Sequence, residues 1–131
     1  MSKTTLADYI GSKLLLNIFP SADTGACATS ICTFNQKASD MDNNKVICVS
    51  ADLPFAAARS CGLKGIDNVV TGSSFRGSFG IDYGVSFSDG PLTGLLSRSV
   101  VVIDEQGIVI HTEQAAEATV ETDYAAAIAV F

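Results

Sequence analysis

The sequence predicts an α/β fold in which a central mixed sheet is flanked by helices. Two apolar runs typical of buried strands, residues 14–19 and 45–50, enclose an amphipathic helical pattern, and this order predicts a parallel strand pair joined by a right-handed crossover. Two further strand-like runs, residues 99–104 and 108–112, flank a turn that ends in Gly107 and therefore indicate an antiparallel hairpin. A sheet that contains both kinds of pairing is mixed.

Length and composition predict one domain over residues 1–131, of which residues 1–12 are a weakly structured lead-in. No segment approaches the roughly 20 apolar residues of a membrane-spanning helix, so we expect no membrane partner. The formal net charge of −6 argues against binding to nucleic acid phosphates. The first residues show no secretory signal pattern, and we expect a cytoplasmic protein that needs no cofactor.

The first strand stops at Pro20, and the helix that follows has three candidate N-cap residues, Ser21, Asp23 and Thr24. If Thr24 is the cap, Cys27 falls in the first helical turn. Cys27 would then share the sheet-facing side of the helix with Ile31, Phe34, Ala38 and Met41. The pattern therefore predicts a cysteine that points towards the sheet.

Pro54 stands where a second, short helix begins, and Gly62 where it ends, which places Cys61 in the last helical turn. The glycine- and serine-rich residues 62–94 form a long connection, which is typical of a functional or interface-forming segment. Within it we expect a short strand at residues 69–71 and one helical turn at residues 79–83.

The chain closes with an alanine-rich helix over residues 119–131, capped near Thr122 or Asp123. The full order, β-α-β-α followed by β-β-α, is that of the minimal thioredoxin-like core, with the strands in the spatial order second, first, third, fourth. The third strand runs antiparallel to the first, so Arg98, which precedes it, is expected near Cys27. The alternative is an exposed arginine at a strand end.

Two of the four cysteines occupy opposite helix ends. Cys27 is expected at a helix N-terminus, where the helix dipole favours a thiolate. Nearby cations lower the pKa of such thiols further. Cys61 is expected near a helix C-terminus, where the dipole disfavours a thiolate. Cys27 is therefore the expected nucleophile, and local unfolding is expected before the two sulfurs can meet at disulfide spacing.

The remaining candidate side chains have structural interpretations. Cys48 is expected in the core, and Cys32 is expected to pack or to be partly exposed. His111 is interpreted as structural, and the cysteine spacing predicts no zinc site. Core packing is also the expectation for the aromatic side chains of residues 75–83, with an apolar edge or dimer contact as the alternative.

Several separated motifs resemble one family. Pro20-x3-Thr24-x2-Cys27 together with Arg98 resembles the peroxiredoxin active-site set. The segments NIFPSADTGACATS, FNQ, SADLPFA, CG and SRSVVVID are similar, in this order, to the thiol peroxidase subfamily. The resemblance covers about residues 13–131. This sequence lacks the extra strands that usually precede LNIFPS, and it has Ile-Cys-Thr where basic residues commonly follow the cysteine.

The resemblance implies a homodimeric, atypical two-cysteine peroxidase with a thioredoxin-type fold. In that reading Cys27 attacks hydrogen peroxide or an organic hydroperoxide, Thr24 orients the thiolate, Arg98 stabilises the charge and Pro20 shields the pocket. Cys61 would resolve the sulfenic acid into a Cys27–Cys61 disulfide. Thioredoxin would be the electron donor.

Two other hypotheses about the function stay open at this point. One is a thioredoxin-type disulfide oxidoreductase, which the missing Cys-x-x-Cys pair disfavours. The other is a non-enzymatic redox sensor with the same fold. A measurement of peroxide turnover with a thioredoxin system distinguishes the peroxidase, the disulfide oxidoreductase and the redox sensor.

Overall fold

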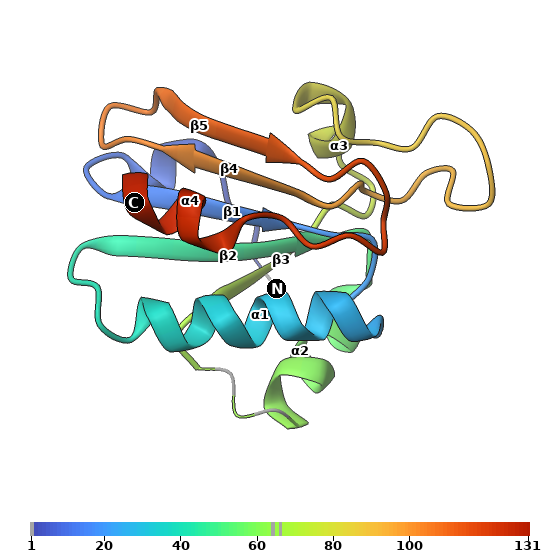
Figure 1. The fold of residues 1–131 in the computed structure, drawn as a ribbon, viewed down its shortest axis with the longest axis horizontal. Coiled ribbons are helices and arrows are strands. Elements are labelled where there is room, and N and C mark those ends of the chain that lie inside the picture. The colour runs from blue at the N-terminus through green and yellow to red at the C-terminus, as the bar shows by residue number, and fades with distance from the viewer. Residues whose placement is uncertain (1, 64, 66) are drawn as a thin grey trace.

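A five-stranded mixed sheet, in the order β3-β2-β1-β4-β5, forms the centre of the protein (Figure 1). The computed structural model describes residues 2–63, 65 and 67–131; Met1 of the predicted domain and Lys64 and Ile66 of the predicted loop lie outside the described residues. The strands are β1 (Lys13–Ile18), β2 (Asn44–Ser50), β3 (Val70–Ser73), β4 (Ser99–Ile103) and β5 (Val109–Gln114).

The pairing confirms the predicted α/β fold class. Strand β1 pairs in parallel with β2 and antiparallel with β4, and β4 pairs antiparallel with β5. The short strand expected near residue 70 is β3, which pairs in parallel with β2. It adds a fifth strand at the edge of the predicted four-strand order.

The predicted helices are present, but their ends differ: the second continues one residue past Gly62, and the last begins at residue 124 rather than 119. The helices are η1 (Leu6–Tyr9, a 3-10 turn), α1 (Gly25–Ala38), α2 (Pro54–Leu63), α3 (Phe79–Asp82) and α4 (Tyr124–Val130). Thr24 caps α1 and Asp123 caps α4, each by accepting a hydrogen bond from a backbone amide. The α1 pattern predicted a helix that reached Met41, but the helix ends at Ala38, with Ser39 as its C-cap.

Alternate residues of the strands point to opposite faces of the sheet, and each face carries its own core. We call thiol face the side with the strand residues Leu15, Val46, Cys48, Val100 and Val102, on which Cys27 and Cys61 also pack. We call far face the side with the strand residues Leu14, Leu16, Ile47, Val49 and Val101. Figure 1 shows α1 and α4 in front of the sheet, and their core residues belong to the thiol face.

Smaller elements cover the far face. Tyr9 of η1, Phe79 of α3 and Tyr83 pack against its core. The rings of Phe79 and Tyr83 stack with their centroids 4.5 Å apart. Phe79 and Tyr83 are therefore partly buried, as the core-packing interpretation expected. That interpretation is wrong for Phe75, which is 54% exposed.

The C-terminal hairpin forms at the predicted turn. Asp104 Oδ1 accepts hydrogen bonds from the amides of Gln106 and Ile108, both at 2.9 Å. Gly107 has a φ of 84°, a left-handed conformation that glycine adopts at little cost. The turn fixes the register in which β5 returns along β4.

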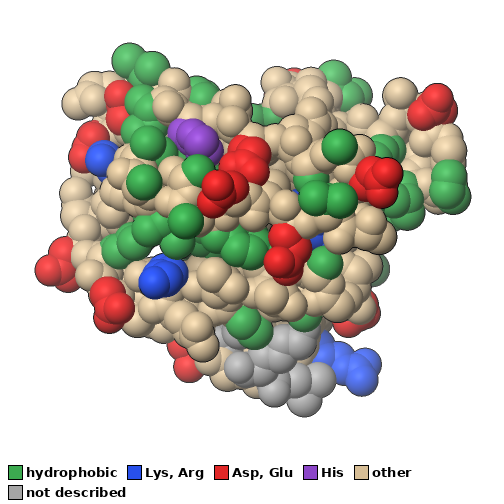
Figure 2. Space-filling view, viewed as in Figure 1, with side chains coloured by type: hydrophobic (Ala, Val, Ile, Leu, Met, Phe, Trp, Pro, Cys, Tyr) green, Lys and Arg blue, Asp and Glu red, His purple; other side chains and the backbone are tan. Residues whose placement is uncertain are grey.

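The surface is acidic on the face that carries α1 and α4. Figure 2 shows red carboxylates scattered over this face, few blue side chains, and an apolar strip between the two helices. Within the described residues, no helix is both long and apolar enough to cross a membrane.

Candidate active site

The cap of α1 orients Cys27. Thr24 Oγ1 accepts a hydrogen bond from the Cys27 amide at 3.4 Å and donates one to the carbonyl oxygen of Ser21 at 3.2 Å. Cys27 is thus the third residue of the helix, with a side chain that has no exposed surface. The cysteine lies in the first turn, where the helix dipole is most positive.

Arg98 reaches Cys27 across the sheet. Ser99 pairs with Ile18 in the antiparallel β1–β4 ladder, which places Arg98 beside the end of β1. Arg98 Nη2 donates to Cys27 Sγ at 3.2 Å, and the arginine side chain is 3% exposed. Both groups are buried, and hydrogen bonds from a charged donor are stronger where water is excluded.

One nitrogen of the same guanidinium has no hydrogen-bond acceptor among the described residues. Arg98 Nε donates to the carbonyl oxygen of Ala118 at 3.0 Å. Arg98 Nη1 is buried and, among the described residues, meets no hydrogen-bond acceptor. An unpaired buried donor is costly, so this nitrogen is suited to an oxygen atom of a small ligand bound beside Cys27.

Asp52 holds the loop between β1 and α1. Its carboxylate accepts hydrogen bonds from Ser21 Oγ at 2.9 Å and from the Ala22 amide at 2.8 Å. Ser50 Oγ at the end of β2 donates to the same carboxylate at 2.8 Å. The turn that leads to the cysteine is therefore fixed to the neighbouring strand, and Pro20 is buried at the start of this turn.

A buried polar network lies under α1. Asn17 Nδ2 donates to Ser30 Oγ at 3.2 Å and approaches Cys48 Sγ at 3.6 Å. Ser30 Oγ in turn donates to the Cys27 carbonyl oxygen at 2.9 Å. These contacts tie the backbone of the cysteine turn to the middle of β1.

Cys48 differs from Cys27 in its surroundings. Burial raises the pKa of the Cys48 thiol from 9.0 to about 12; the Asn17 hydrogen bond opposes this rise, and the nearby Cys61 adds to it. Cys48 is 2% exposed and stays protonated at physiological pH, which is the behaviour of an inert core cysteine. Its predicted place in the core is confirmed.

The predicted site residues are brought together to different degrees. Arg98 and Thr24 both contact Cys27 directly, through its sulfur and its amide. Cys61 belongs to the same core cluster as Cys27 and is 8% exposed, and all four cysteines carry thiols rather than disulfides. Pro20 lies at the entrance to the turn rather than in a hydrogen-bond network with the sulfur.

Several residues of the site were not predicted from the sequence. Asp52 stands in the SADLPFA motif, but nothing in the sequence indicates that its carboxylate binds the turn before α1. Asn17 did leave a signal, because a polar residue in the middle of an apolar strand predicts a buried partner. Ala118 left no signal, since its contact with Arg98 depends on how the C-terminal segment folds back.

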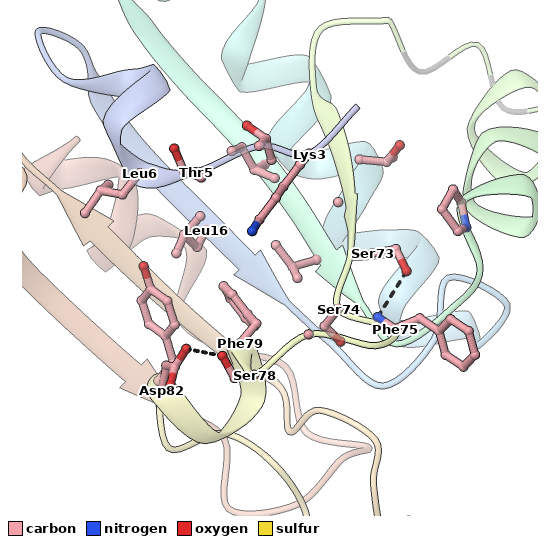
Figure 3. Close-up of a pocket in the computed structure, with 18 of the residues that line it drawn as sticks. Lys3, Thr5, Leu6, Leu16, Ser73, Ser74, Phe75, Ser78, Phe79 and Asp82 are labelled. Atoms are coloured by element: carbon pink, nitrogen blue, oxygen red, sulfur yellow. Dashed lines mark hydrogen bonds between the residues drawn. The ribbon is translucent and has the colours of Figure 1, made fainter. Parts of the chain in front are cut away.

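A cavity of about 780 Å³ lies on the far face (Figure 3). Its floor is formed by Leu14, Leu16, Ile47 and Val49, away from Cys27, and Figure 3 shows Lys3 extending into it. Many of its hydroxyl groups already have partners: Ser78 Oγ donates to Asp82 at 2.7 Å, and Ser73 Oγ donates to the Asp52 carbonyl oxygen at 2.6 Å.

Among the described residues that line this cleft, none has a buried side-chain nitrogen or oxygen without a hydrogen-bond partner. A metal centre is not indicated either. Within the part of the chain that the structure describes, no three His, Cys, Asp or Glu side chains group closely enough to hold a metal ion.

Comparisons with known proteins agree with this geometry. The family model described as Redoxin matches residues 1–128. The thiol peroxidase of Corynebacterium glutamicum is 49% identical over 129 residues, which cover 98% of this chain and 78% of the relative.

Solved structures give the same result. A peroxiredoxin-like protein from Aquifex aeolicus superposes with a TM-score of 0.88 at 35% identity, over 92% of this chain and 70% of the other. A thiol peroxidase from Chromobacterium violaceum, 23% identical, shares the fold with a TM-score of 0.83, over 95% of this chain and 73% of the other. This chain therefore belongs to the redoxin family and is a thiol-dependent peroxidase of the peroxiredoxin type.

Proposed function

We propose that Cys27 is the peroxidatic cysteine of this enzyme and that Cys61 is the resolving cysteine. The observation that carries the proposal is the 3.2 Å contact in which Arg98 Nη2 donates to Cys27 Sγ at the N-terminal turn of α1. A cationic donor and a helix N-terminus both stabilise the thiolate, which is the nucleophilic form of a cysteine.

In the first step the Cys27 thiolate attacks one oxygen of hydrogen peroxide or an organic hydroperoxide. The S–O bond forms while the O–O bond breaks, and the departing oxygen takes up a proton and leaves as water or an alcohol. The sulfur becomes a sulfenic acid. Arg98 Nη1, the buried donor without a partner among the described residues, binds a peroxide oxygen during this attack.

The two other predicted site residues support this step. Thr24 orients Cys27, because its hydroxyl oxygen holds the cysteine amide at the start of the helix. Pro20 is buried at the end of β1 and carries no backbone N–H, so it shields the approach to the sulfur without offering a competing donor.

In the second step the Cys61 thiol attacks the sulfenic sulfur. The S–S bond forms, the S–O bond breaks, and the hydroxyl group leaves as water. Membership of both cysteines in one core cluster supports this pairing. Cys27 has no exposed surface and Cys61 is 8% exposed, so we propose that the first turn of α1, or α2, opens locally during the cycle.

Thioredoxin is the proposed electron donor. Its dithiol transfers two electrons and two protons to the Cys27–Cys61 disulfide and becomes a disulfide itself, which restores both thiols. The reducing cytoplasm is the proposed compartment, because all four cysteines carry thiols and such a compartment keeps them reduced.

A second copy of this chain is the proposed partner at the rim of the sheet. Leu53, Phe55, Phe75 and Ile81 are exposed by 46%, 69%, 54% and 79%, and we call them the apolar rim. Pro54 joins them, since it lines the far-face cleft together with Phe75. Phe75 also lines a second cleft, together with Ile81. Exposed apolar side chains that line adjoining clefts are typical of an interface, and sedimentation should show a dimer that Ile81→Asp dissociates. A wild-type monomer would contradict this part of the proposal.

The thiol chemistry is tested by peptide mapping after the reduced protein has reacted with one equivalent of peroxide. We expect one disulfide, between Cys27 and Cys61. In Cys61→Ser the sulfenic acid at Cys27 should form and persist, whereas turnover with thioredoxin should stop.

Two serine variants complete that experiment. Cys27→Ser should abolish peroxide turnover, and the matched Cys32→Ser, on the same helix, should retain it. Undiminished turnover in Cys27→Ser, or a disulfide that joins other cysteines in the wild type, would overturn the proposal.

A further inference from the structure

Asp52 connects the two segments that carry Cys27 and Cys61. It follows β2, which ends at Ser50, and precedes α2, which begins at Pro54 and holds Cys61. Its carboxylate, however, binds the turn that leads from β1 into α1. One residue therefore contacts the segment of the proposed peroxidatic cysteine and leads into the helix of the proposed resolving cysteine.

The main chain of Asp52 is anchored to the ends of two strands. Its amide donates to Ser50 Oγ on β2 at 3.3 Å, and its carbonyl oxygen accepts from Ser73 Oγ on β3 at 2.6 Å. The next residue, Leu53, accepts the Ala57 amide at 3.2 Å, a hydrogen bond of the first turn of α2. Asp52 is therefore held by the sheet on one side and continues directly into α2 on the other.

Both oxygens of the Asp52 carboxylate accept hydrogen bonds. Oδ1 accepts from Ser21 Oγ at 2.9 Å, and Oδ2 accepts from the Ala22 amide and from Ser50 Oγ, both at 2.8 Å. Ala22 is 5% exposed and Ser50 is 2% exposed, so water has little access to these donors. Hydrogen bonds to a carboxylate are stronger than those between neutral groups, and this set holds the turn against the sheet.

Hydrogen bonds continue from this turn to Cys27. The Ser21 carbonyl oxygen accepts from the Thr24 amide at 3.3 Å and from Thr24 Oγ1 at 3.2 Å. Thr24 Oγ1 in turn accepts from the Cys27 amide at 3.4 Å. The cap of α1 is therefore held by Ser21, and Ser21 is held by Asp52.

We infer that Asp52 is a positioning residue that keeps the first turn of α1 closed, with Cys27 against Arg98. The inference rests on the proposed roles of Cys27, Arg98 and Cys61. Release of the carboxylate frees Ser21 and with it the helix cap. The turn then leaves Arg98, and Cys27 is free to approach Cys61. Asp52 thus favours the reaction with peroxide and opposes the disulfide step.

The test uses Asp52→Ala in the reduced full-length protein. Rapid mixing with hydrogen peroxide, acid quenching and mass spectrometry measure two rates: formation of the Cys27 sulfenic acid, and formation of the Cys27–Cys61 disulfide that follows. The first rate should fall about tenfold, because Cys27 is no longer held in its reactive position. The second should rise about tenfold, because the turn opens more readily once hydrogen bonds to a charged group are lost. Rates that both fall, or that both stay unchanged, would overturn the inference.

Excess peroxide provides a second readout. The Cys27 sulfenic acid either condenses with Cys61 or attacks a second peroxide, in which case an S–O bond forms, the O–O bond breaks, water leaves and a sulfinic acid results. Faster disulfide formation competes with this attack. Asp52→Ala should therefore give several-fold less sulfinic acid per disulfide than the wild type in peptide mapping. A larger share of sulfinic acid in the variant would contradict the inference.

Asp104→Ala is the matched control. Asp104 is half-buried like Asp52, and its carboxylate likewise holds a turn, by accepting the amides of Gln106 and Ile108 at 2.9 Å. It follows Ile103, at the end of β4 that pairs with the start of β1, whereas the cysteine turn follows the end of β1. Both variants should lower the melting temperature, but Asp104→Ala should keep both rates. Equal kinetic changes in the two variants would reflect lost stability alone and overturn the inference.

Peptide mapping of the wild type separates this inference from the proposed function. If the Cys27–Cys61 disulfide forms and Asp52→Ala has wild-type rates, the inference is wrong and the proposed function stands. If no such disulfide forms in the wild type, the proposed function fails, and the inference fails with it. Should Asp52→Ala not fold, Ser21→Ala removes one hydroxyl group from the same link and should move both rates in the same directions by a smaller factor. Unchanged rates in Ser21→Ala would then overturn the inference.

Discussion

The two faces of the sheet use the same strands for different purposes. On the thiol face, the buried side chains of Asn17, Ser30 and Arg98 form polar contacts beside Cys27. On the far face, the strands present an aliphatic floor of Leu14, Leu16, Ile47, Val49 and Val101. Neighbouring residues of one strand, such as Ile47 and Cys48, therefore belong to different chemical environments.

This difference shows how the protein separates reactivity from support. The polar groups that surround Cys27 lie on one face, where each has to be satisfied or reserved for a ligand. The strand floor of the other face is aliphatic and contributes hydrophobic free energy. Substitutions on the thiol face should therefore change the reaction with peroxide, and substitutions on the far face should change stability.

The largest effect on reactivity is expected from Arg98→Met. Removal of a preorganised donor to developing charge slows reactions by about 10²–10³-fold, and we expect a decrease of this order in the rate of Cys27 oxidation by peroxide. Arg76→Met is the control, because Arg76 lines the far-face cleft. A similar decrease in both variants would remove the distinction between the faces.

Leu16→Ala should show the opposite pattern. Leu16 is 4% exposed on the far face, and truncation of such a residue costs about 2–5 kcal/mol of unfolding free energy. Chemical denaturation measures this loss, while the rate of Cys27 oxidation in the folded variant should equal that of the wild type. A slower reaction at full folding would mean that the far face also tunes the site.

The buried thiol of Cys48 should make stability depend on alkaline pH. Below about pH 9 the thiol is protonated whether the chain is folded or unfolded; as the pH rises towards about 12, the unfolded chain loses this proton and the folded chain keeps it. The free energy of unfolding should then fall by up to about 1.4 kcal/mol per pH unit.

Cys48→Val isolates this contribution, since valine fits a buried strand position and does not titrate. The raised pKa of Tyr124 acts in the same direction, and it cancels when the two proteins are compared. Denaturation curves recorded at several alkaline pH values should show a flatter decline for the variant. Parallel declines would place the titration elsewhere.

The smallest effect is expected at the cap of α1. Thr24→Val removes the oxygen that accepts the Cys27 amide, and loss of such a cap costs about 1 kcal/mol. Thr24→Ser keeps the oxygen and should be near wild type in a thermal melt. Equal stability of both variants would show that the cap contributes little to the thiol face.

Much of the architecture could be predicted because its signals are local. The apolar run before Pro20 predicted β1, the three candidate caps after it, Thr24 among them, predicted the start of α1, and the turn at Gly107 predicted the hairpin. Each signal depends on residues within a few positions of one another. The end of α1 was placed too late because Met41 continues the apolar pattern after the helix has stopped at Ala38.

The approach of Arg98 to Cys27 was predictable for a different reason. The two residues are 71 positions apart, but antiparallel pairing of the first and third expected strands places Arg98 beside the end of the first. The sequence, however, did not settle whether this side chain would be exposed. Its burial follows from cover by the C-terminal segment, which no local pattern indicates.

By itself the sequence determined the elements, their order, and the position of Cys27 in the first turn of a helix. Only the tertiary structure decided which groups surround the sulfur: the Arg98 guanidinium at 3.2 Å, the Asp52 carboxylate under the turn, and the Ala118 carbonyl that orients Arg98. The physical reason is the separation in sequence between the residues that interact. Helix phase and strand alternation are set by neighbours in the chain, whereas hydrogen bonds between distant side chains depend on how the whole chain packs.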